Sequence, residues 1–327
     1  MNAIIYRISI ITALFVTPFL SQAQYTETIN TNNPGLSQGA YALGTGVAQV
    51  EANVFYRTEE HVIQRYERDY YGLNFQLRYG AFFEELEFSY IGRFASVEQT
   101  QITGFGNSQF SFNNFSRSTL GAKYMFFDPK RVFGEKKINL YSYHANNRLN
   151  WKDLIPALAI YAGANIDLSD NNLLTPPKDP TFSPRIELIT QNNWGRWVLV
   201  TNFGVDRLGT DFPSWQWIIT MTHSINNKWA FFGEYQGFKS DFYSDDLARG
   251  GATYLINKDW QVDSSVTVNF KDTPTVFQVN LGMSYRIDFH KDPEIKQSGS
   301  QGGNKRKKKN KENKLNLEED QNPDGRG

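Results

Sequence analysis

The chain has 327 residues, a formal net charge of zero, no cysteine and a mean hydropathy of −0.52. Without cysteine there can be no disulfides, no lipidated N-terminal cysteine and no thiolate metal ligands. The low hydropathy excludes a helical membrane protein but not a membrane barrel, in which only alternate residues face lipid. The aromatic content of 15% also suits a barrel.

The first 23 residues have the pattern of a secretory signal peptide. Arg7 supplies the positive region, residues 8–20 form a mostly apolar core, and Ser21-Gln22-Ala23 fits a small-residue cleavage site. The apolar run is shorter than the roughly 20 residues that a membrane-spanning helix needs. We therefore expect export, with residues 1–23 removed and residues 24–45 forming an N-terminal periplasmic segment.

A hydropathy period of two runs through most of residues 46–289. In residues 71–79 every odd position is apolar or aromatic and every even position is polar or glycine, and residues 275–289 alternate in the same way. A helix would scatter such residues around its circumference, so the pattern favours strands. It predicts strands near residues 46–57, 68–79, 83–94, 117–127, 154–167, 181–191, 195–206, 214–224, 228–238, 249–256, 260–270 and 275–289. The predicted fold is all-β, a transmembrane antiparallel β-barrel of about twelve strands, because each run is long enough for a tilted strand to cross a bilayer.

The connections between these strands alternate in length. Tight turns are predicted at residues 80–82, 192–194, 225–227 and 257–259, and longer polar loops at residues 58–67, 95–116, 168–180, 207–213 and 239–248. Short periplasmic turns and longer external loops are typical of bacterial outer-membrane barrels, and this pattern predicts that both termini are periplasmic. Residues 128–153 are unusually long for a periplasmic connection and could form a plug, a short helix or an extra hairpin.

Aromatic residues recur at equivalent places in the predicted topology. Trp197, Trp229 and Trp260 each follow a predicted periplasmic turn, and Tyr79 and Phe289 end strands. Tryptophan and tyrosine concentrate at membrane–water interfaces. These five residues are therefore predicted to form an aromatic girdle.

The composition changes sharply at residues 290–327. A Gly/Ser/Gln-rich linker precedes the basic stretch from Lys305 to Lys311, and an acidic block follows it. Such a segment cannot bury a core and is predicted to be a disordered, charged periplasmic tail. The basic stretch is either solvated or in contact with a periplasmic protein or an anionic envelope polymer. Export excludes nucleic acid as its partner.

Charged residues within the strands are predicted to face the lumen, because an arginine or lysine facing lipid costs about 2–4 kcal/mol at mid-membrane. They either fill the barrel with salt bridges or line a water path, since twelve strands fall between the about eight that side chains fill and the about 16 that leave a channel. In an open pore, the excess of acidic groups would favour cations. The lumen-lining candidates are Glu51, Arg78, Glu85, Glu87, Lys123, Arg185, Glu187, Glu234, Asp263 and Arg286.

Catalytic and metal motifs are weak or absent in the sequence. Residues 35–39 match G-x-S-x-G, but they follow a polar turn rather than a strand and precede no helix, which that motif requires. The four histidines have no metal-ligand spacing. We expect no enzymatic activity, no metal site and no cofactor.

Several short motifs follow one another in a characteristic order: Asn33-Pro34-Gly35-Leu36-Ser37, Leu77-Arg78-Tyr79-Gly80, Leu120-Gly121-Ala122-Lys123-Tyr124, the stretch at residues 232–238 and the closing residues 282–289. In these motifs, which span most of residues 33–289, the chain resembles outer-membrane proteins grouped as transporters of the meta-pathway of phenol degradation. The resemblance implies a barrel and uptake of small molecules. We do not extend the phenol substrate to this protein, because none of the motif residues indicates recognition of an aromatic compound.

The expected function is that of an outer-membrane channel or transporter for small solutes, with membrane lipid and the solutes as partners. The alternative is a non-conducting barrel that anchors or docks an envelope assembly through its tail and residues 128–153.

Overall fold

The computed structural model describes residues 28–289 except residues 105, 135–139, 143–147, 149, 169–171, 176–179 and 242. The predicted signal peptide (residues 1–23) and the predicted tail with its basic stretch from Lys305 to Lys311 lie outside the described residues.

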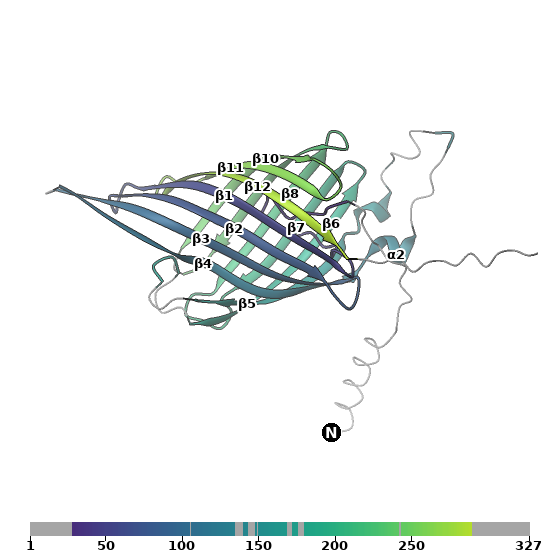
Figure 1. Cartoon of the computed structure of the whole chain (residues 1–327), viewed down its shortest axis with the longest axis horizontal. Coiled ribbons are helices and arrows are strands. Elements are labelled where there is room, and N and C mark those ends of the chain that lie inside the picture. Colours follow the sequence, from purple (N-terminus) through teal and green to yellow (C-terminus); the bar gives the residue numbers. More distant parts are fainter. Residues whose placement is uncertain are drawn as a thin grey trace, which may run out of the picture. The chain divides into compact units, whose positions relative to one another are not determined.

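Twelve antiparallel strands form a closed barrel in which each strand pairs with its neighbours in sequence and β1 pairs with β12 (Figure 1). This confirms the predicted fold class. The strands are β1 Val47–His61, β2 Tyr66–Gly80, β3 Leu86–Thr103, β4 Gly106–Phe127, β5 Ala157–Ile166, β6 Phe182–Trp194, β7 Trp197–Asp206, β8 Ser214–Ser224, β9 Trp229–Lys239, β10 Ser244–Leu255, β11 Trp260–Asn269 and β12 Thr275–Asp288.

The sequence alternation becomes an apolar outer face and a polar inner face. In β12, Gln278 and Asn280 are buried, whereas Phe277 and Leu281 are 43% and 60% exposed. Successive side chains of a strand point to opposite faces. A single register therefore places all the polar residues of the alternating pattern inside the barrel. The pairing of Glu51 with Gln76 of β2 and with Ser284 of β12 shows the same register across β1.

Three of the predicted loops are largely strand. β1 and β2 extend to within four residues of each other, β10 begins at Ser244, and β3 and β4 continue as one hairpin through most of residues 95–116. In Figure 1 this hairpin projects beyond the ends of the other strands. Serine, threonine, asparagine and glutamine occur on both faces there, so the hydropathy alternation disappears although the backbone ladder continues. The predicted connections at residues 168–180 and 207–213 do join strands.

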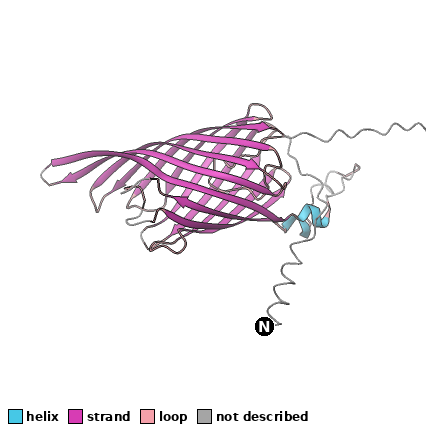
Figure 2. Cartoon of the chain, turned by 60° about the horizontal axis from the view of Figure 1, so that its bottom comes forward, coloured by secondary structure: helices cyan, strands magenta, loops and turns pink. Residues whose placement is uncertain are grey.

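Residues 128–153 contain a short helix, α2 Pro129–Phe133, and a 3₁₀ turn, η1 Trp151–Leu154. Asp128 caps α2 by accepting the amide of Lys130 at 3.0 Å, and the indole of Trp194 donates to the carbonyl of Asp153 at 2.6 Å. Of the three structures left open for this connection, the described part contains the helix. It lies at the opposite end of the barrel from the tip of the β3–β4 hairpin (Figure 2).

Among the described residues, no helix is both long enough and apolar enough to cross a membrane.

Candidate functional site: the polar lumen

Residues 28–45, which we call the plug, lie inside the barrel. The plug makes hydrogen bonds to inward-facing side chains on β1, β2, β3, β4, β6, β7, β9 and β11. Strands on opposite sides of a closed ring can share one partner only if that partner crosses the interior. The sequence predicted a periplasmic segment over residues 24–45 and did not include these contacts.

Carboxylates of the barrel wall bind the amide groups of the plug. Glu51 accepts the backbone N–H of Asn32 at 3.0 Å and of Asn33 at 2.9 Å. Glu234, on a distant strand, accepts the N–H of Leu36 at 3.0 Å. Hydrogen bonds to an ionised acceptor are roughly twice as strong as neutral ones, so these two carboxylates fix the turn at residues 32–36.

Cations of the wall bind the carbonyl groups of the plug. Lys123 Nζ donates to the carbonyls of Gly39 at 2.8 Å and Tyr41 at 3.1 Å, and Arg78 Nη1 donates to the carbonyl of Asn30 at 2.7 Å. Wall groups of both signs therefore hold the plug, largely through its main chain.

The charged side chains beneath the plug form a continuous row on β1 to β4. Glu51 pairs with Arg78 at 2.9 Å, Arg78 with Glu87 at 2.7 Å, and Glu87 with Lys123 at 3.3 Å. All four side chains are almost completely buried. Buried charges persist when they are paired and hydrogen-bonded, and the row and the plug together provide those partners.

The apolar part of the plug packs next to this row. Ala40 is buried against the inward-facing Ala157, Ala159, Tyr161 and Ile189, and Tyr41 packs on the same cluster. Ser37, the serine of the G-x-S-x-G match, is buried, and its amide donates to Glu234 at 3.4 Å. The described residues around it form turns and extended chain, with neither the preceding strand nor the following helix of a nucleophile elbow.

The other lumen-lining candidates are also in the interior, with one exception. Arg185 Nε donates to Glu187 at 2.8 Å, Glu234 pairs with Arg249, and Asp263 and Arg286 are buried on β11 and β12. Glu85 lies in the turn just before β3, where it pairs with Arg131 of α2. Nine of the ten candidates thus lie on the inner face, and Glu85 belongs to the end of the barrel.

Several inward-facing arginines were not among the candidates, including Arg57, Arg93, Arg117 and Arg249. Arg249 was missed because the predicted strand began at that residue, whereas β10 begins at Ser244. Arg93 and Arg117 have the same parity as Glu87 and Lys123 in their strands. A strict application of the alternation would have found both.

A second apolar cluster lines the lumen farther from the plug. Phe55, Ala95 and Val97 are buried there, and Tyr70, Phe112 and Leu174 pack against them. Leu174 belongs to the β5–β6 connection, so part of that connection packs against the inner face of β1 and β3.

The predicted girdle residues lie at or near strand ends, and each tryptophan packs on an aromatic ring of an adjacent strand. Trp197, Trp229 and Trp260 are the first residues of β7, β9 and β11. Their ring centroids lie 4.0 Å from His223, 4.8 Å from Tyr254 and 4.2 Å from Tyr285, respectively. Tyr79 and Phe289 are exposed at the ends of β2 and β12.

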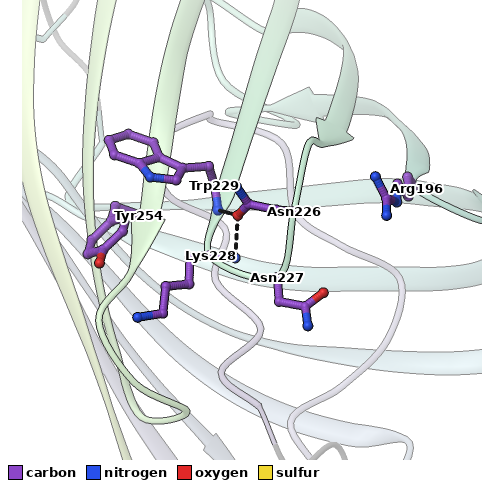
Figure 3. A pocket seen from close by; sticks show the side chains of 6 residues that line it. All are labelled: Arg196, Asn226, Asn227, Lys228, Trp229 and Tyr254. Atoms are coloured by element: carbon purple, nitrogen blue, oxygen red, sulfur yellow. Dashed lines mark hydrogen bonds between the residues drawn. The ribbon is translucent and has the colours of Figure 1, made fainter.

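A shallow depression of about 520 Å³ lies beside Trp229, at the turn between β8 and β9 (Figure 3). Trp229 and Tyr254 lie side by side in it, and the amides of Lys228 and Trp229 both donate to Asn226 at 2.8 Å. Basic groups next to amphipathic rings are typical of the membrane–water boundary. We therefore assign this depression to the outer surface rather than to the lumen.

A closed barrel with an apolar outer face and a charged, partly plugged lumen has the fold of an outer-membrane β-barrel of the channel type. The chain belongs to the family described as "Putative MetA-pathway of phenol degradation", whose profile matches residues 31–287. This confirms the resemblance seen in the sequence motifs.

Solved structures share the fold at low sequence identity. An outer-membrane channel from Pseudomonas putida F1 is 9% identical, with a TM-score of 0.52, and the match covers 79% of this chain and 100% of that one. The toluene transporter TodX of Pseudomonas putida is also 9% identical, with a TM-score of 0.43, and the match covers 80% of this chain and 95% of that one. A comparison with curated proteins finds no match.

Proposed function

We propose that this protein is an outer-membrane channel for small solutes, with both termini in the periplasm and with the plug as its gate. The observation that carries the proposal is the way the plug is held. It crosses the lumen on hydrogen bonds to Glu51, Glu234 and Lys123, and no strand of the barrel includes it.

Attachment through polar groups is compatible with release. Water entering the lumen can replace each hydrogen bond to a carboxylate at limited net cost, because even a bond to a charged group contributes only about 1.5–3 kcal/mol net. The buried apolar residues of the plug are few, namely Ile29, Ala40, Ala42 and Leu43, with Tyr41 packed on the wall cluster. A gate needs an element that can leave without unfolding the wall, and attachment through groups that water can replace supports that role for the plug.

The family and the similar outer-membrane channel support transport more than anchoring or catalysis. We therefore do not propose the docking role. Its two predicted elements were the tail, which lies outside the described residues, and residues 128–153, which are described only in part.

Single-channel recording of the purified barrel in planar bilayers tests the proposal. We expect a small, fluctuating conductance for the full chain and a larger, steadier one after deletion of residues 29–42. Glu51→Gln with Glu234→Gln should shift the full-length protein toward the behaviour of the deletion. Arg196→Gln, in the turn between β6 and β7, is the control and should leave conductance unchanged.

Folding of each variant is checked by heat-modifiable migration on gels. If neither the full chain nor the folded deletion variant conducts at any voltage, the channel is disproved. If both conduct equally, the barrel is a channel but the plug is not its gate.

A further inference from the structure

Two arginines face each other across β3 and β4 inside the barrel. Arg93 and Arg117 are register partners, and both lie on the inward face, since they have the parity of Glu87 and Lys123. Like charges placed directly opposite on neighbouring strands destabilise the pairing. A register shift follows immediately, between Arg93 and Phe94, and such bulges re-aim side chains.

Neither arginine has an acidic partner among the described residues, although other lumen arginines do. Arg57 pairs with Glu59 at 2.8 Å, and Arg249 pairs with Glu234. The pair adjoins further positive charge, since Arg57 and Arg249 lie close enough to act on Arg93.

The two carboxylates that act on Arg117 are shared with Arg185. Glu187 accepts from Arg185 Nε at 2.8 Å, and Asp206 lies 3.9 Å from Arg185 Nη1. The pair is therefore a cationic position in the wall at which neither arginine forms an ion pair of its own with a described carboxylate.

The same position has an apolar side. The guanidinium carbon of Arg93 lies 4.3 Å from the centroid of the Phe55 ring, a cation–π contact. The ring of Phe55 lies against Gly72, where an added Cβ atom would come within 2.4 Å of it. Ala95 and Val97 are buried beside Phe55, and Tyr70 and Phe112 pack on this cluster.

We propose that Arg93 and Arg117 form a binding position for the carboxylate of a small organic acid, whose apolar or aromatic part packs on the Phe55 cluster. This inference rests on the proposed channel function and names the solute class. Two guanidinium groups present forked donors that match a carboxylate, and a bound anion relieves the repulsion between them. An aromatic acid combines the charge and the flat apolar surface that this position accepts.

The position also changes the selectivity expected from the sequence. That expectation counted carboxylates, but Glu51, Glu87, Glu187 and Glu234 all have cationic partners in the structure. Arg93 and Arg117 form no ion pair with a described residue, so we expect this stretch of the lumen to favour anions.

Calorimetric titration of the detergent-purified full chain with benzoate tests the site without requiring conductance. Benzyl alcohol, which has the ring without the charge, and acetate, which has the charge without the ring, should bind much more weakly. Arg93→Gln and Arg117→Gln should each weaken benzoate binding about tenfold, as expected when one charge-assisted hydrogen bond is lost. Arg131→Gln supplies the same loss of charge outside the lumen and should not change binding.

Thermal unfolding separates loss of the site from damage to the barrel. Removing one of two repelling arginines should leave the unfolding temperature equal or higher while benzoate binding falls. Arg93→Lys adds a second measure, because it keeps the charge but loses the fork and should also bind benzoate more weakly.

The titration gives the decisive outcomes. No benzoate binding by the full chain, or equal binding by a folded Arg93→Gln/Arg117→Gln variant, would overturn the inference even if the barrel conducts. Benzoate binding that depends on both arginines in a barrel that never conducts would support the site and disprove the channel.

Discussion

Arg78 and Glu87 form a bidentate pair inside the barrel, in which Nε donates to Oε1 at 2.7 Å and Nη2 donates to Oε2 at 2.9 Å. Both side chains are fully buried, and Glu87 also accepts the amide of Leu43 in the plug at 3.2 Å. One carboxylate thus links β2 to the plug. Its loss should affect both the wall and the gate.

Glu87→Gln should destabilise the barrel by about 3–5 kcal/mol, because it leaves Arg78 and Lys123 as buried charges with too few partners. The midpoint of heat-modifiable migration in detergent measures this. Glu85→Gln is the matched control. It removes a partly exposed pair with Arg131 and should cost less than about 1 kcal/mol. Equal losses in the two variants would contradict the buried row.

Asp263→Asn should raise the unfolding midpoint. Both carboxylate oxygens of Asp263 are buried and lack a hydrogen-bond partner among the described residues. Burying a neutral polar group without a hydrogen bond costs about 1–3 kcal/mol of folding free energy, and burying an unpaired charge costs more. Removing the charge of Asp263 should therefore stabilise the fold.

Asp245→Asn is the opposing control for that change. The buried Asp245 accepts the hydroxyl of Tyr243 at 2.6 Å and the amide of Asn269 at 3.1 Å. Its neutralisation should lower the midpoint. If the unfolding midpoint falls in both variants, the carboxylate of Asp263 must have hydrogen-bond or ionic partners in the protein in solution.

Leu281→Arg and Thr253→Arg test the assignment of the two faces. Leu281 is exposed on the outer face of β12, where an arginine should cost about 2–4 kcal/mol if it lies mid-membrane. Thr253 faces inward directly opposite Asp263, so an arginine there gains a carboxylate partner and should be tolerated. Barrel assembly in membranes and migration on gels report both. Equal damage would show that the register is off by one residue.

Orientation in the membrane is tested by single cysteines, which have no background because the chain has none. An impermeant thiol reagent should label a cysteine at Ser108, in the long hairpin, on intact cells. A cysteine at Asn226, in a tight turn, should react only after the outer membrane is permeabilised. The reverse pattern would place the termini outside.

The strands were predictable because lipid and lumen impose opposite polarity on alternate residues. Within the apolar band that rule holds from Tyr71 to Tyr79 and again in β12. It fails in the β3–β4 hairpin, where both faces are polar and only the backbone ladder maintains the strand. The same failure hid Arg249, which lies inside β10 rather than at its start.

The plug could not be predicted in the same way. Its residues have no hydropathy period, and its partners lie far away in sequence, as with Leu36 and Glu234. The charged wall residues were found as candidates, but what Glu51, Glu234 and Lys123 bind is main chain, which leaves no signature in residue types.

That mode of attachment determines what the barrel can recognise in its own plug. Glu51, Glu234 and Lys123 contact backbone amides and carbonyls of the plug. Almost any sequence supplies these groups, because only proline lacks the N–H donor. Gly35 is a constrained position, because a Cβ atom there would lie 2.6 Å from Glu234. The lumen therefore recognises the plug largely by its backbone shape, supplemented by side-chain contacts such as Gln38 with Glu187. A peptide that keeps residues 30–41 should therefore seat in a plug-deleted barrel and block it from solution.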